Sequence, residues 1–87
     1  MISAIPDQTR LAPPVRLDVR GLAPPEPMQR VLAALAQLPP RAPLVVRIHR
    51  EPLFLYQIIE PDGWSRSSRQ LAPDDWEICI WRREDQP

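Results

Sequence analysis

The stretch VRLDVRGLAPPEPMQRVLAALAQL, residues 15–38, joins a pattern typical of a β-strand to one typical of an α-helix. Residues 15–19 alternate between apolar and charged side chains, as expected of a strand with one buried face. Gly21 interrupts this alternation, and the apolar residues of 26–38 then recur at helical spacing. A strand that leads directly into an amphipathic helix predicts a fold in which helices pack against a sheet.

A second strand and a second, shorter helix are predicted further along the chain. Residues 44–49 alternate in the same way as the first strand. Pro52 suits the first turn of a helix, where no backbone N–H donor is needed, and Pro61-Asp62-Gly63 is expected to end that helix. The side chains expected to face the core from this helix are Leu53, Leu55, Tyr56, Ile58 and Ile59.

Two extended runs, residues 64–71 and 76–83, complete the pattern. Residues 72–75 between them contain a proline and two aspartates, which favours a hairpin connection. The predicted order is therefore strand, helix, strand, helix, strand, strand. The fold class expected is α+β, as a two-layer α/β sandwich with both helices on one face of the sheet.

Size and charge limit the functions that the chain can have. Its 87 residues are expected to form one domain over residues 15–83, with flexible tails at 1–14 and 84–87. Eleven basic residues, all arginine, balance eleven acidic ones, so net charge gives no reason to expect nucleic acid or a membrane as partner. No segment approaches the roughly 20 apolar residues of a membrane span, and a secretion signal is not evident, so a cytoplasmic protein is expected.

Residues 17–28, LDVRGLAPPEPM, resemble the signature of TusA-like (SirA-like) sulfur carriers. In that family a strand ending in Leu-Asp and a Gly-Leu turn precede Cys-Pro-x-Pro at the start of the first helix. Pro24 stands here at the position of the cysteine. The positions that match the signature are Gly21, Leu22, Pro25 and Pro27.

Two further stretches, residues 50–56 and 76–80, are similar to an uncharacterised branch of that superfamily which usually lacks the cysteine. The resemblance covers about Val15 to Arg83. It implies a four-stranded mixed sheet of order 1-2-4-3, in which strand 4 is antiparallel to the others. Members of the branch often occur beside hemerythrin-like proteins and proteins of nitrogen-oxide metabolism.

The substitution at Pro24 removes one chemistry. In the carriers the thiol lies at a helix N-terminus, where the helix dipole favours the thiolate and hence persulfide transfer. Proline has neither sulfur nor a backbone N–H, so sulfur transfer at this position is chemically impossible. Cys79, the one cysteine of the chain, is expected in a strand, without help from a helix dipole.

A ligand or partner site is expected at the carboxyl ends of the first two strands, where both helices begin. Ligands commonly bind at this edge of α/β sheets, and helix N-termini favour anions. The alternative is that Arg20 and Arg50 form solvated ion pairs with Asp18, Glu26 or Glu51. The residues expected to line the site are Arg20, Glu26, His49, Arg50 and Tyr56.

A second candidate site is the sheet face that no helix covers. An exposed tryptophan among arginines is typical of a protein-binding hot spot, and Arg47, Cys79 and Trp81 are the expected contact residues. The alternative is a covered face, with Trp81 packed against the N-terminal tail. Strand alternation places on this face Arg16, Arg47, His49, Glu77, Cys79 and Trp81, with Trp76, Ile78 and Ile80 on the opposite side.

The sequence favours binding over catalysis. It contains no phosphate-binding glycine loop and no nucleophile elbow, and no cofactor or metal is expected. The function expected is a non-catalytic binding or adaptor domain that contacts a protein partner or a small anionic ligand. The alternatives are a redox or sulfur-related accessory protein that uses Cys79, and an accessory protein of nitrogen-oxide metabolism that holds metal or haem through His49 with Cys79 or Met28.

Overall fold

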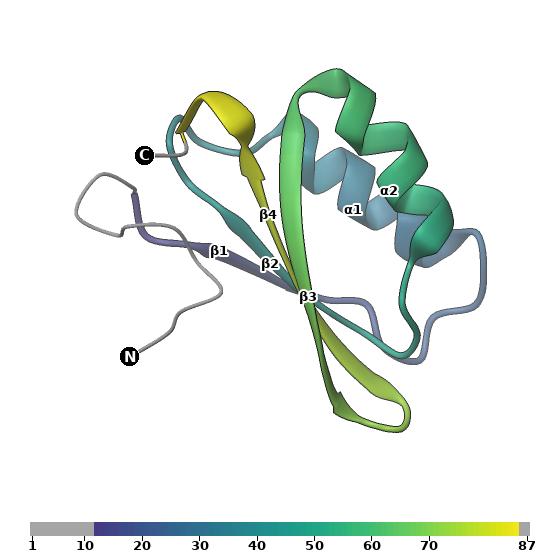
Figure 1. The fold of residues 1–87 in the computed structure, drawn as a ribbon. Coiled ribbons are helices and arrows are strands. Elements are labelled where there is room, and N and C mark those ends of the chain that lie inside the picture. The colour runs from purple at the N-terminus through teal and green to yellow at the C-terminus, as the bar shows by residue number, and fades with distance from the viewer. Residues whose placement is uncertain (1–11, 86–87) are drawn as a thin grey trace.

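The computed structural model describes residues 12–85, which form a four-stranded sheet and two α-helices (Figure 1). Two short 3-10 turns, η1 (Glu60–Asp62) and η2 (Arg83–Asp85), follow the second helix and the last strand. In chain order the main elements are β1 (Val15–Asp18), α1 (Glu26–Ala36), β2 (Leu44–Ile48), α2 (Leu53–Ile59), β3 (Trp64–Ala72) and β4 (Asp75–Arg82).

The strands lie in the order β1-β2-β4-β3, so the hairpin strand β4 is inserted between β2 and β3. β1 pairs with β2 in parallel, whereas β4 is antiparallel to both of its neighbours. Both helices lie on the same side of the sheet, as Figure 1 shows. The predicted α+β sandwich is confirmed, and so is the strand order that the resemblance implied.

The element boundaries differ from the predicted ones by one or two residues. The helix α1 ends at Ala36 because the N–H groups of Gln37 and Leu38 donate to carbonyls three residues back, which tightens the last turn. Pro52 precedes α2 as its N-cap, and its carbonyl accepts the first helical bond from Tyr56 at 3.3 Å. The β3–β4 connection is shorter than expected, since β4 already begins at Asp75.

Two glycines that follow β1 and η1 have a left-handed backbone conformation. Gly21 has a φ of 83° in the turn after β1, and Gly63 has a φ of 93° after η1. Glycine has no Cβ and adopts this conformation without the steric cost that other residues meet. These positions are where the sequence predicted the first strand and the second helix to stop.

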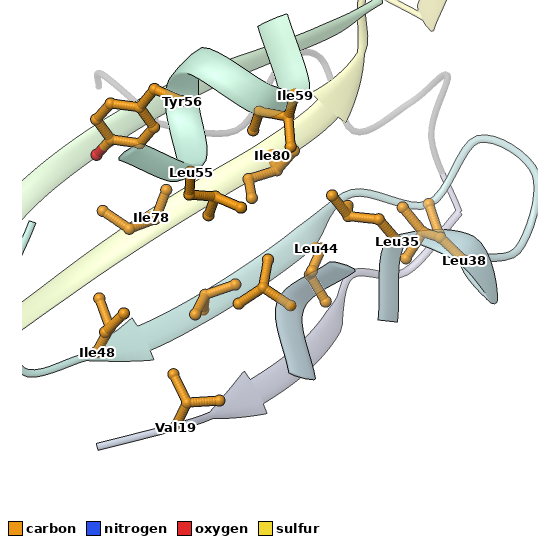
Figure 2. Close-up of a cluster of buried hydrophobic side chains, with 13 residues drawn as sticks. Val19, Leu35, Leu38, Leu44, Ile48, Leu55, Tyr56, Ile59, Ile78 and Ile80 are labelled. Atoms are coloured by element: carbon orange, nitrogen blue, oxygen red, sulfur yellow. The ribbon is translucent and has the colours of Figure 1, made fainter. Parts of the chain in front are cut away.

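The core fills the space between the sheet and the helices (Figure 2). The strands supply aliphatic side chains on their helix-facing side, and each such side chain stabilises the fold by roughly 1.5–3 kcal/mol when fully buried. The helices α1 and α2 each contribute a stripe of apolar side chains to the core. The side chains with 5% exposure or less include Val31, Leu35, Leu44, Val46, Ile48, Leu55, Tyr56, Ile59, Ile78 and Ile80.

One predicted core residue is not in the core. Leu53 was expected to face the sheet, but its side chain is 62% exposed. At about 100° per residue, Leu55, Tyr56 and Ile59 share the inward face of α2, and Leu53 lies roughly a third of a turn away from its centre. The prediction for Leu53 is therefore wrong, and its exposure leaves an apolar group at the start of α2.

The opposite face of the sheet carries a smaller apolar cluster. Val45 of β2 pairs with Cys79 of β4, and both pack with Trp81. The predicted alternation of β4 is confirmed, because Ile78 and Ile80 lie on the helix side.

The chain ends are described only in part. Of the tails predicted at residues 1–14 and 84–87, residues 1–11, 86 and 87 lie outside the described residues. Within the described range, the Ala12 N–H donates to the Arg41 carbonyl at 3.0 Å, and η2 follows β4. Neither helix between residues 12 and 85 is long and apolar enough to span a membrane.

Candidate binding site

A pocket of about 350 Å³ opens beyond the end of β2, between the beginnings of α1 and α2. One wall is formed by Pro24, Pro25, Pro27, Met28 and Val31, and the other by residues 48–55. The two walls come from the loops that leave β1 and β2 and enter the helices, which Figure 1 shows side by side. The pocket therefore lies where the sequence predicted a site, at the carboxyl ends of the parallel strands.

The chemistry of the α1 wall is apolar. Proline at the N-cap and within the first turn removes the N–H groups that would otherwise point out of the helix. Two of the remaining donors are used, since the Glu26 N–H donates to the Ala23 carbonyl and the Gln29 N–H donates to the Pro25 carbonyl. The start of α1 thus presents proline rings and the Met28 side chain to an occupant, with fewer free N–H donors than a helix N-terminus usually offers.

The rim of the pocket on the α2 side is also apolar. Leu53 and Phe54 line the pocket, and their exposures are 62% and 64%. The other large apolar side chain exposed among residues 12–85 is Leu71, far along the chain in β3. Two neighbouring exposed apolar residues beside an apolar pocket are a combination typical of binding surfaces.

Three polar residues, His49, Arg50 and Glu51, complete the lining. The His49 Nδ1 atom is buried and has no hydrogen-bond partner. Arg50 is exposed and forms no ion pair with any residue of the described chain. The Glu51 carboxylate, by contrast, accepts hydrogen bonds from the Tyr56 hydroxyl at 3.2 Å and from Ser68 at 3.0 Å.

Tyr56 acts behind the pocket and does not line it. Its side chain is buried, and burial is the main reason why its hydroxyl pKa is raised to about 12. The Arg66 guanidinium lies 3.8 Å from the centre of its ring. The tyrosine thereby holds Glu51 in place, and its role as a direct ligand contact stays a prediction.

Arg20 and Glu26, the other two residues expected at this site, are engaged elsewhere. Arg20 binds Asp18 at 2.7 Å and Asp75 at 3.3 Å, and Glu26 binds Arg30 at 2.7 Å one helical turn away. The Arg20 side chain is the main cause of the low pKa of Asp18, about 2. The Arg20–Asp18 pair is one of the ion pairs that the sequence left open as an alternative, whereas Glu26 pairs with Arg30 and Arg50 forms no ion pair within the described chain.

A family model described as "Uncharacterized conserved protein (DUF2249)" matches residues 16–82, from β1 to the end of β4. The chain belongs to the DUF2249 family. No curated protein and no solved structure matches it. The matched range contains the pocket, both helices and the whole of the β3–β4 hairpin.

On the other face of the DUF2249 domain, the expectation of an exposed tryptophan is wrong. Trp81 is 8% exposed and Cys79 is 3% exposed. The residue beside Cys79 on β2 is Val45, while Arg47 is held by Asp75. The alternative, packing of Trp81 against the N-terminal tail, concerns residues outside the described chain.

His49 was also expected on that face, and this placement is wrong. Since β2 ends at Ile48, His49 leaves the sheet and lines the pocket with residues from both helices. Cys79 therefore lies on the opposite side of the sheet from His49. Of the two ligand pairs considered for a metal or haem, only His49 and Met28 share a site.

The Cys79 thiol of the DUF2249 domain is buried and has a raised pKa. Burial is the main cause that raises the pKa of Cys79 to about 12, and the negative charge of Glu77 adds to it. A thiol with such a pKa carries almost no thiolate at neutral pH.

Among residues 12–85, no three side chains of the His, Cys, Asp or Glu type gather into a group that would hold a metal ion.

The sequence did not single out Leu53 and Phe54 as site residues. A signal was present, because adjacent residues of a helix point about 100° apart and a pair of large apolar residues beside Leu55 and Tyr56 cannot all face one core. In the sequence, Pro24 was considered only for its missing sulfur and N–H. The contribution of the prolines as an apolar surface depends on the two loops being brought together by the sheet.

Proposed function

We propose that this DUF2249 domain is a non-catalytic binding domain whose pocket between the starts of α1 and α2 receives an apolar group. The observation that carries the proposal is the combination of apolar walls with the exposed rim residues Leu53 and Phe54. Burying apolar surface there is favourable by roughly 25 cal/mol per Å² before the cost of association is subtracted. The domain would then act through contact with its occupant.

The resemblance to TusA-like sulfur carriers supports the same function, and we propose that the domain belongs to that superfamily. Its strand order agrees with the one that the resemblance implied. Pro24 lines the pocket at the position where a carrier would hold its cysteine. A scaffold that keeps the site but lacks the sulfur is suited to binding in place of sulfur relay. A cytoplasmic location remains part of this proposal.

The state of the ionisable groups also favours binding over a redox or sulfur-transfer role. The Cys79 thiol is buried on the face away from the pocket, and its pKa is raised to about 12. The Tyr56 hydroxyl is equally difficult to ionise. A general acid or base works best when its pKa lies near the working pH, and neither group meets this condition.

The experiment that tests the proposal is an NMR titration of the domain with two small aromatic probes, indole and p-cresol. Saturable shifts of the Val31 and Leu55 methyl signals are expected, with dissociation constants on the order of 1 mM. The variant Phe54→Ala should weaken binding about threefold, whereas Leu71→Ala, which removes an exposed apolar group outside the pocket, should not. Absence of saturable shifts at about 10 mM probe would overturn the proposal.

A second candidate function is haem binding in the same pocket, which one observation favours. His49 and Met28, an imidazole and a thioether, both line the pocket, and both are known ligand types for haem iron. Titration with haem should then give a sharp Soret band that His49→Leu and Met28→Leu each alter. Identical spectra for these variants and the parent would exclude this candidate.

A further inference from the structure

We infer that the occupant of the pocket is a segment of a partner protein in which a large apolar side chain is flanked by acidic residues. This inference rests on the proposed function, because it names the kind of group that the pocket receives. It is carried by three observations at the pocket: the exposed apolar rim, the unpaired Arg50, and the position of His49.

The rim indicates a protein and not a small molecule. A volume of about 350 Å³ lies near the lower end of the range of small-molecule sites, roughly 300–1,000 Å³. A molecule that fills it leaves the outer parts of Leu53 and Phe54 in water, since these side chains are 62% and 64% exposed. A protein surface can place one side chain in the pocket and cover both rim residues at once.

The charged groups at the pocket indicate an acidic partner. Glu51 is occupied, because its carboxylate accepts hydrogen bonds from both Tyr56 and Ser68. Arg50 is exposed beside it and forms no ion pair within the described chain. The Tyr56 and Ser68 hydroxyls are neutral donors that direct the Glu51 carboxylate toward themselves, whereas the Arg50 guanidinium has no ion-pair partner within the described chain. A carboxylate next to the apolar anchor would supply that partner.

His49 supplies a second donor on the same side. Its Nδ1 atom is buried without a partner, and an unpartnered acceptor is tolerated in a protein interior better than an unpartnered N–H. A hydrogen on Nε2 avoids leaving a buried N–H without a partner at Nδ1. With Nδ1 enclosed, Nε2 is the ring nitrogen left to meet an occupant, and it would donate to an acceptor such as a carboxylate or a carbonyl oxygen.

The chain offers a matched control for the charge. Arg16 is also exposed and forms no ion pair within residues 12–85. It lies on β1 between Val15 and Leu17, which face the core, so its side chain leaves the opposite face of the sheet. Reversing the charge of Arg16 changes the net charge of the domain by the same amount as reversing Arg50, but away from the pocket.

The experiment uses three synthetic peptides and the complete protein. The first, acetyl-Glu-Glu-Phe-Glu-Glu-amide, carries both the anchor and the acidic flanks. The second replaces the phenylalanine by alanine, and the third replaces every glutamate by lysine. Binding is measured by NMR and by calorimetry, and the first peptide is expected to bind at least about tenfold more tightly than either of the others. Its affinity should fall as salt is added, because exposed charges are screened.

Variants then assign the binding to the pocket. Arg50→Glu should lower the affinity for the acidic peptide about fivefold and raise the affinity for the lysine peptide. Arg16→Glu should change either affinity by less than about twofold. Phe54→Ala should lower the affinity for the acidic peptide about tenfold, and Leu71→Ala should leave that affinity unchanged. His49→Leu should lower the affinity for the acidic peptide about threefold, which corresponds to one lost hydrogen bond.

Each contrary outcome overturns the inference. Equal binding of the acidic and lysine peptides would remove the charge argument, and equal effects of Arg50→Glu and Arg16→Glu would place the contact outside the pocket. If indole and p-cresol bind in the pocket but no peptide does, the proposed binding function survives and the partner segment is wrong. If neither probe nor peptide binds, both proposals fail.

Discussion

The Arg47 Nε atom donates a hydrogen bond to Asp75 Oδ1 at 2.9 Å, which ties the strand β2 to the first residue of β4. The Asp75 carboxylate also binds the guanidinium of Arg20, and Arg20 in turn binds Asp18. Two arginines and two aspartates thus form one network across the end of β1, β2 and β4. The network fixes the hairpin on the sheet at the point where the loops of the pocket begin.

This network predicts loss of stability in acid. The folded-state pKa of Asp18 is lowered from 3.8 to about 2 by Arg20, and that of Asp75 is lowered by Arg47. A carboxyl group with a lowered pKa contributes stability that is present above its unfolded pKa and is lost as the pH falls toward its folded pKa. The melting temperature should therefore drop between pH 3.8 and about 2, and Asp75→Asn should flatten this dependence. Asp74→Asn, at the neighbouring exposed residue, should leave the pH profile unchanged, and equal effects of the two variants would contradict the prediction.

The core between sheet and helices predicts a large cost for truncation at Ile80. Its side chain is 0% exposed and lies in the centre of the sheet on the helix side. Ile80→Ala should lower the free energy of unfolding by about 2–5 kcal/mol, through lost burial and the cavity left behind. Urea unfolding measures the change. Leu71→Ala, at an exposed position, should stay within about 0.5 kcal/mol of the parent, and a similar loss in both variants would show that the core is assigned wrongly.

Most of the fold follows from the sequence because its signals are local. The alternation in residues 44–49 and the helical spacing in residues 26–38 each depend on neighbours within one element. The order of the strands is not local: the insertion of β4 between β2 and β3 came from a resemblance to a family. Periodicity alone shows which residues share a face of a strand, but it does not show which strands lie beside it in the sheet.

The candidate site was predicted less well because it depends on contacts between distant segments. His49 lies one residue beyond β2, and this single residue decides whether it continues the sheet face or turns toward the pocket. Asp75 was expected in a turn, but it is the first residue of β4 and its carboxylate binds Arg47, whose register partner in β4 is Glu77. Such pairings arise from the three-dimensional path of the chain and have no signature in sequence spacing.

The buried thiol predicts a large difference in reactivity between the folded and the unfolded protein. Cys79 is 3% exposed, and its pKa is raised to about 12 by burial. Ellman's reagent should modify it at least about a hundredfold more slowly in buffer than in concentrated urea, since thiolate and access are both restricted in the fold. The measurement is the rate of colour formation at constant pH. Rapid modification of the folded protein would revive a redox role for this residue.

The clearest test of the relation to sulfur carriers is to restore the missing thiol. Pro24 is exposed at the start of α1 and lines the pocket, so a cysteine at this position is accessible in a way that Cys79 is not. In the background of Cys79→Ser, the substitution Pro24→Cys should give a folded protein whose thiol reacts at least about tenfold faster than that of the parent. A matched variant, Ala33→Cys, places a thiol at an exposed position well inside α1, away from the positive end of the helix. If the thiol at position 24 reacts more slowly than the one at position 33, the pocket does not favour sulfur chemistry, and the resemblance concerns the fold alone.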